Sequence, residues 1–135
     1  MILEKNKNTV EHFWVKFCEG DVEGALALLD DHVNWQCMGI AGDLPISGNQ
    51  NKQQIADLIN MVKTLFVDGL AITTTGWTAE RDRVAVEATG YGKKYNGTVY
   101  QNNYHFIFEL HDDKIVQIRE YGDTLNVKRV FFDDV

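Results

Sequence analysis

Two kinds of hydrophobic pattern divide the chain, and they change over at about residue 66. In the first half, apolar residues recur at every third or fourth position, which places them on one face of a helix. Gly20 ends the first such run, and Asp21 follows it with a side chain suited to capping the next helix. The pattern therefore predicts helices at residues 10–19, 22–30 and 51–62, a short strand at residues 32–38 and a loop at residues 39–48.

In the second half, polar and apolar residues alternate, as in strands that have one buried face. Four strands are predicted, at residues 70–79, 83–92, 98–110 and 114–123. Asn96-Gly97 is the strongest signal for a two-residue hairpin turn, because both central positions of a type I′ turn need a positive φ. The order predicts an α+β fold, in which three N-terminal helices pack on a curved, mostly antiparallel sheet. A single domain, residues 1–135, is expected from the length.

The hairpin between the last two strands decides which polar side chains face the helices. In the third strand, Tyr104 and Phe106 belong to the more apolar face, which should be the inner one. A two-residue turn would pair His105 with Glu120. A three-residue turn would instead pair Tyr104 with Glu120 and Phe106 with Ile118. We prefer the three-residue turn, because it brings the apolar halves of both strands to one face.

Several polar side chains then share this inner face. A two-residue Asn-Gly turn pairs Glu87 with Phe106, so that Glu87 also points inward. The face would carry two carboxylates, Glu87 and Glu120, beside the phenol of Tyr104 and the amide of Asn102. Burial of an unpaired carboxylate costs several kcal/mol or raises its pKa. An apolar pocket with a few convergent polar groups is the usual form of a small-molecule site.

The residue types suggest one chemistry for such a site. Glu120 would act as acid or base, and Tyr104 would donate a hydrogen bond to a developing oxyanion. Glu87 and Asn102 would orient the substrate. The expected apolar and aromatic walls of the pocket are Phe13, Trp14, Trp35, Phe106 and Ile118.

Structural alternatives remain open for these residues. Glu120 could form an ion pair with Arg83 or with a lysine on a helix, and Glu87 could lie in water at the rim of the sheet. Tyr104 could be a core residue that bonds to the main chain. In the preferred register His105 faces outward, whereas the other register makes it a partner of Glu120.

Composition and charge limit the kinds of binding partner and the cellular locations expected for this protein. The formal net charge is −7 and basic residues do not cluster, which disfavours nucleic acid and anionic membrane surfaces. No apolar run reaches the roughly 18 residues of a membrane span, and the N-terminus lacks the apolar core of a signal peptide. Cys18 and Cys37 are expected to be free thiols in the cytoplasm. No histidines or carboxylates have metal-ligand spacing, so neither metal nor cofactor is expected.

The order of elements resembles the cone-shaped fold of the NTF2-like superfamily. Within it, the chain is most similar to the SnoaL-like group, which is related to ketosteroid isomerases and polyketide cyclases. The stretches that carry the resemblance are residues 17–21, 28–33, 46–48, 96–104 and 113–124. The resemblance implies a pocket between helices and sheet, and a homodimer formed through the outer face of the sheet. Residues expected on that outer face are Val84, Val86, Ile107, Ile115 and Tyr121.

Known activities of the family do not carry over residue by residue. Gln36 stands where the steroid isomerases have a carboxylate base, and Phe13 stands where they have an oxyanion-binding tyrosine. Arg83 and Glu120 match two positions of the epoxide hydrolase set, but Ala85 replaces its remaining carboxylate. The expected function is binding of a small, largely apolar organic molecule, with acid–base catalysis of isomerase, cyclase or hydrolase type. The alternative is a non-catalytic module for ligand binding or dimerisation, since this fold serves many functions.

Overall fold

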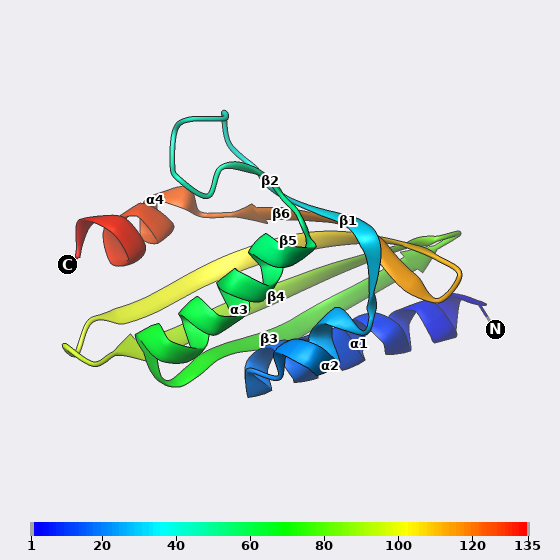
Figure 1. Ribbon diagram of the computed structural model, residues 1–135, viewed down its shortest axis with the longest axis horizontal. Coiled ribbons are helices and arrows are strands. Elements are labelled where there is room, and N and C mark those ends of the chain that lie inside the picture. Colours follow the sequence, from blue (N-terminus) through cyan, green and yellow to red (C-terminus); the bar gives the residue numbers. More distant parts are fainter. Residues whose placement is uncertain (1, 135) are drawn as a thin grey trace.

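The computed structural model describes residues 2–134 and arranges them around one curved six-stranded sheet (Figure 1). The helices are α1 (Ile2–Glu19), α2 (Val22–Leu26), α3 (Lys52–Leu65), α4 (Thr124–Val127) and a wider π-type turn, η1 (Lys128–Asp133). The strands are β1 (Leu29–Cys37), β2 (Gly48–Gln50), β3 (Phe66–Glu80), β4 (Arg83–Lys94), β5 (Val99–His111) and β6 (Lys114–Gly122). Their order in the sheet is β2-β1-β6-β5-β4-β3, and all neighbours are antiparallel except β1 and β6.

The long helices cover one face of the sheet because each has a single apolar side (Figure 1). The buried residues of α1 include Val10, Phe13, Trp14 and Phe17. The start of α3 is fixed by a capping box, in which the side chains of Asn51 and Gln54 each accept a hydrogen bond from the other residue's N–H. Among residues 2–134, the structure contains no helix that is long and apolar enough to cross a membrane.

The predicted α+β fold is confirmed, but several elements differ from the prediction. The second helix is shorter than predicted, because Leu29 already belongs to β1 and pairs with Ile115 of β6. Strand β2 was not predicted. Neither was the C-terminal helical segment formed by α4 and η1, which buries only Val127 and Val130 and so lacks a recognisable helical period.

The β4–β5 hairpin corrects the predicted register. The turn has three residues rather than two: Lys94 N donates to Thr98 O over 2.8 Å, and Gly97 has a φ of 94°. Glu87 therefore lies opposite His105, and both side chains are exposed on the outer face. The prediction that Glu87 faces inward is wrong, because Val84 and Val86 of the same strand take the inner positions.

The β5–β6 hairpin has neither of the two expected registers. The turn is a two-residue one, and both Asp112 and Asp113 have positive φ angles of 49° and 67°. A bulge then follows, because Leu110 pairs with Ile115 whereas Glu109 pairs with Gln117. As a result Glu120 lies opposite Phe106.

The bulge restores the arrangement of faces that the preferred register predicted. Phe106, Phe108 and Ile118 are buried on the inner face, while His105 is exposed beside Tyr121. The outer-face prediction is wrong for three residues, since Val84, Val86 and Ile115 are fully buried. Ile107 and Tyr121 do lie on the outer side, beside the ion pair between Arg119 and Glu109.

Candidate functional site

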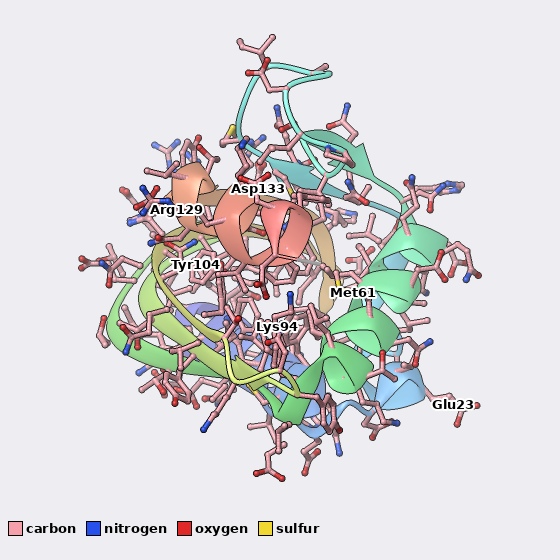
Figure 2. All side chains as sticks on the ribbon, turned by 90° about the vertical axis from the view of Figure 1, so that its left-hand side faces the viewer. Glu23, Met61, Lys94, Tyr104, Arg129 and Asp133 are labelled. Carbon is pink, nitrogen blue, oxygen red and sulfur yellow. The ribbon has the colours of Figure 1, made fainter. Side chains whose placement is uncertain are left out.

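A pocket of about 60 Å³ lies between the sheet, α1, α3 and the C-terminal segment. Figure 2 looks along the sheet toward this region, with Met61 of α3 and Tyr104 of β5 on opposite sides. Most of the lining is aromatic or aliphatic. The polar lining residues are Cys37, Gln50, Tyr100, Tyr104 and Glu120. A volume of this size holds a few water molecules.

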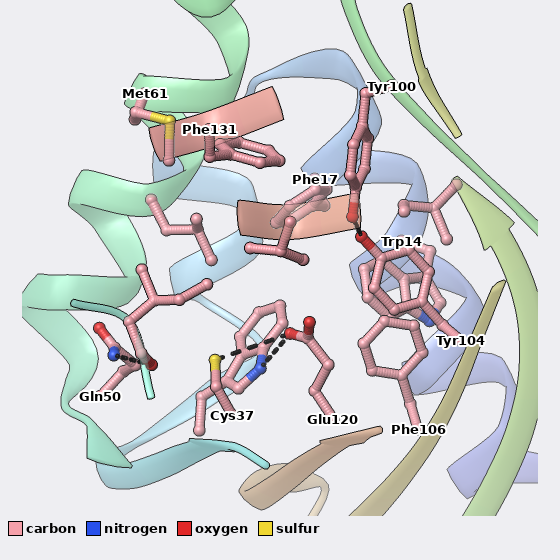
Figure 3. Close-up of a pocket in the computed structure, with 15 residues that line it drawn as sticks. Trp14, Phe17, Cys37, Gln50, Met61, Tyr100, Tyr104, Phe106, Glu120 and Phe131 are labelled. Carbon is pink, nitrogen blue, oxygen red and sulfur yellow. Dashed lines mark hydrogen bonds between the residues drawn. The ribbon is translucent and has the colours of Figure 1, made fainter. Parts of the chain in front are cut away.

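Among residues 2–134, Glu120 is the only carboxylate that lines this pocket (Figure 3). Its Oε1 accepts a hydrogen bond from Trp35 Nε1 over 3.0 Å and a weaker one from Cys37 Sγ over 3.8 Å. Burial raises the pKa of Glu120 to about 7, although both hydrogen bonds act in the opposite direction. No ion pair among residues 2–134 includes Glu120, so the structural pairing with Arg83 is not formed. Glu120 can therefore gain or lose a proton near neutral pH.

A short hydrogen-bond network of two phenols and one amide is the second polar feature of the pocket. The hydroxyls of Tyr100 and Tyr104 are hydrogen-bonded to each other, and Asn102 Nδ2 donates to Tyr100 Oη over 2.8 Å. Burial raises the pKa of Tyr104, and it raises that of Tyr100 to about 12. Both phenols thus keep their protons at neutral pH. Because the Tyr100 oxygen already accepts from Asn102, Tyr100 can donate to Tyr104 and leave the Tyr104 proton free for a ligand.

Two glycines create the space that the Tyr104 ring occupies. A Cβ atom at Gly90 of β4 would lie 2.8 Å from Tyr104 Cε2, and one at Gly122 of β6 would lie 3.0 Å from Tyr104 Cδ1. The ring also stacks on Phe106, with centroids 5.1 Å apart. Neighbouring strands therefore hold the phenol directly against their backbones.

Five predicted site residues lie together in the pocket wall: Trp14, Trp35, Tyr104, Phe106 and Glu120. Phe13 and Ile118 are fully buried in the core and do not line the pocket. Asn102 lies behind Tyr100, where its amide also bonds to the backbone of Asp123 over 3.1 and 3.2 Å. Glu87 is on the opposite face of the sheet, so it does not belong to this site.

Several lining residues were missed from the sequence. Tyr100 shares the two-residue period of Asn102 and Tyr104, and Cys37 shares that of Trp35, so alternation could have found both. Val127 and Phe131, by contrast, come from the unpredicted C-terminal segment. Phe131 packs edge-on against Tyr100, with centroids 5.0 Å apart.

The site offers few groups that could hold a metal ion. Within residues 2–134, no three histidine, cysteine, aspartate or glutamate side chains are grouped closely enough to bind one. The pocket contributes one carboxylate and one thiol.

Comparison with known protein families decides the classification. The family model of the SnoaL-like domain matches residues 10–118, which is most of the chain. The chain belongs to the SnoaL-like family. A comparison with curated protein sequences gave no significant match.

Solved structures with the same fold are distant in sequence. TerC, co-crystallised with polyporic acid, is 20% identical, with 93% of this chain and 97% of TerC covered and a TM-score of 0.80. Bal32a, from a soil-derived mobile gene cassette, is 17% identical, with coverage of 96% and 98% and a TM-score of 0.84. IdmH from Streptomyces antibioticus, which is assigned as a polyketide cyclase, is 16% identical, with coverage of 93% and 97% and a TM-score of 0.77. These solved structures share the fold of this chain.

Proposed function

We propose that this SnoaL-like protein binds a small, largely apolar organic molecule in its pocket and catalyses a proton transfer in that molecule. One observation carries the proposal: the pocket wall combines a carboxyl group that titrates near pH 7, Glu120, with a protonated phenol, Tyr104. A general base works best when its pKa is close to the working pH. TerC with polyporic acid, and IdmH as an assigned polyketide cyclase, agree with such ligands on this fold.

The proposed step is proton transfer at a carbon next to a carbonyl group. The Glu120 carboxylate takes the proton, and the carbonyl oxygen becomes an enolate oxygen. Tyr104 stabilises that oxygen by donating a hydrogen bond, and Tyr100 and Asn102 support Tyr104 from behind. Return of the proton to another carbon gives isomerisation, and attack of the enolate on a second carbonyl gives ring closure.

An exchange experiment tests this proposal without the natural substrate. The protein is incubated in D₂O with 2-tetralone, an apolar ketone, and loss of the α-protons is followed by NMR. Wild-type protein should accelerate exchange, and Glu120→Gln should lower that acceleration by about 100-fold or more. Tyr104→Phe should lower it by about 10- to 100-fold. Glu87→Gln and Tyr91→Phe, which alter exposed residues of the outer face, serve as matched controls.

The alternative function, a non-catalytic binding module, gives a different result. Because the pocket volume is about 60 Å³, entry of an organic molecule requires a wall of the pocket to move for either function. For a binding module, tetralone would quench the fluorescence of Trp14 and Trp35, yet exchange would be equal in wild type and Glu120→Gln. If exchange is equal and no quenching occurs, both forms of the proposal fail.

We also propose a homodimer formed through the outer face of the sheet, and a cytoplasmic location. The outer face presents Ile107 and the partly exposed ring pair of His105 and Tyr121, and none of the helices within residues 2–134 covers it in Figure 1. A reducing compartment agrees with the two free thiols, Cys18 and Cys37.

A further inference from the structure

A thiol lies in the pocket beside the carboxylate, and the proposed proton transfer does not use it. Cys37, at the end of β1, is 7% exposed and lines the pocket together with Glu120, its register partner on β6. Figure 3 shows the sulfur directed toward Glu120, whose Oε1 is 3.8 Å away. A nucleophile, a base and the oxyanion donor Tyr104 therefore share one apolar space.

We propose that Cys37 is a nucleophile that forms covalent adducts with neutral α,β-unsaturated carbonyl compounds bound in this pocket. The combination that points to this ligand class is a thiol for the alkene carbon, a carboxylate for the thiol proton and a phenol for the carbonyl oxygen. The inference uses the pocket and Glu120 of the proposed function, but it requires no turnover.

The addition balances without any further reactant. The sulfur of Cys37 forms a bond to the β-carbon while its proton passes to the Glu120 carboxylate. The π electrons of the alkene move to the carbonyl oxygen, where Tyr104 donates a hydrogen bond to the enolate. Protonated Glu120 then returns the proton to the α-carbon. The product is a saturated thioether, and every protein group except the thiol is restored.

The second cysteine of the chain is a natural control. Cys18 Sγ accepts a hydrogen bond from Ile72 N over 3.3 Å and donates one to Ile72 O over 3.9 Å. The backbone therefore engages the thiol both as acceptor and as donor. No carboxylate is hydrogen-bonded to it among the described residues. Cys18 lies beside open grooves at the surface and is less buried than Cys37. Small polar reagents should therefore prefer Cys18, whereas an apolar enone should prefer Cys37.

The pH dependence should also separate the two thiols. The titratable groups that face Glu120 are Cys37 from β1 and Tyr100 and Tyr104 from β5. Burial raises the pKa of all three, so only Glu120 changes charge near pH 7. Adduct formation at Cys37 should rise with a midpoint near pH 7 and then level off. At Cys18, the rate should continue to rise above pH 8 with the thiolate fraction.

The test uses 2-cyclohexen-1-one as the probe, with the modified cysteine identified by peptide mass spectrometry. The enone should label Cys37 at least about tenfold faster than Cys18, and iodoacetamide should reverse this order. Glu120→Gln should slow the labelling of Cys37 by about 100-fold and leave Cys18 unchanged. Glu87→Gln should alter neither rate, and Cys18→Ser should leave the labelling of Cys37 intact. Circular dichroism checks that each variant is folded.

Two results would overturn the proposal. The first is equal labelling of both cysteines by the enone in wild-type protein, which needs no variant. The second is labelling of Cys37 that is unaffected by Glu120→Gln or that continues to rise above pH 8. The exchange test with 2-tetralone is independent, because 2-tetralone has no alkene conjugated to its carbonyl and cannot accept the thiol. Exchange of 2-tetralone without labelling of Cys37 would contradict only this inference. Labelling of Cys37 without exchange would contradict only the proposed function.

Discussion

At the scale of single residues, the most consequential feature is one acid held in an apolar wall. Glu120 receives hydrogen bonds from Trp35 and Cys37 but has no cation beside it among the described residues. Desolvation of the charged form is consequently the largest influence on its pKa. The protein keeps a reactive proton at neutral pH, and it does so at a cost in stability.

That cost predicts that Glu120→Gln stabilises the protein, and that the gain in stability depends on pH. The pKa of Glu120 is about 7 in the folded protein, against 4.5 for an ordinary glutamate, so the folded state holds more protons between these values. Stability therefore falls as the pH rises from 4.5 to 7, and the loss is complete above pH 7. The relevant quantity is the free energy of unfolding of Glu120→Gln minus that of wild type. We expect this difference to be about 2 to 3 kcal/mol larger at pH 8 than at pH 4.

Urea denaturation of wild type and variant at both pH values measures this difference. Glu87→Gln, whose carboxylate is exposed in the native protein, should show no such change between the two conditions. A Glu120→Gln variant whose stability relative to wild type is the same at both pH values would contradict the raised pKa.

The sequence predicted part of this site for a sound reason. Glu120 and Tyr104 were found because the apolar alternation of β5 and β6 fixes which side chains share a face. A two-residue Asn-Gly turn misplaces Glu87, because that turn would direct Val84 and Val86 of the same strand away from the core in which they are buried. Burial of two branched side chains outweighs the preference of an Asn-Gly pair for one turn type.

At the scale of elements, the C-terminal segment matters most, because it closes one side of the pocket. Lys94 Nζ, almost fully buried, donates to Val130 O over 2.9 Å, to Asp134 O over 2.6 Å and to Asp134 Oδ2 over 2.8 Å. Figure 2 shows Lys94 beneath the C-terminal helix. Hydrogen bonds from Asn96 and Lys94 lower the pKa of Asp134 to about 2, so this attachment keeps its charges over the usual pH range.

Loss of this attachment should release the segment. In Lys94→Met, amides of residues 124–134 should exchange with D₂O about tenfold faster or more than in wild type. Lys93→Met is the matched control, because Lys93 is exposed on the other face of the same strand. Hydrogen-exchange mass spectrometry gives the rates. Unchanged protection in Lys94→Met would mean that Val127, Val130 and Phe131 hold the segment by packing alone.

Elements differ in how well the sequence predicts them. The long helices and strands were found because each repeats its apolar period several times. The bulge after Ile115 was not predicted in this way, because its extra residue interrupts the two-residue alternation of β6: Ile115 and Ile118, three positions apart, are both buried. The C-terminal segment, with α4 of four residues and η1 of six, is too short for a period to be visible.

At the scale of the whole molecule, the two faces of the sheet have different tasks. The inner face carries the core and the pocket, whereas the outer face of β4, β5 and β6 is uncovered and mixes polar and apolar groups. A net charge of −7 on every copy opposes self-association at low ionic strength. A dimer through this face should therefore become tighter as salt screens the repulsion.

The proposed dimer predicts that Ile107→Glu is monomeric. A charge at the centre of the outer face would be buried without a partner in the interface, which costs several kcal/mol. Val15→Glu, at a residue 52% exposed on the other side of the molecule, is the control and should remain dimeric. Light scattering during gel filtration gives the mass. A wild-type mass equal to the monomer at every salt concentration would contradict the dimer.

The two glycines beside Tyr104 bear on how this pocket can be changed. Because Gly90 and Gly122 come within 3.0 Å of ring atoms at their virtual Cβ positions, neither accepts a side chain while the phenol stays in place. The residue at position 104 therefore determines which residues fit at positions 90 and 122, although the three positions lie on three different strands. A redesign that enlarges the pocket by removing the phenol gains two further positions at which new side chains can enter. A redesign that keeps the phenol must leave all three unchanged.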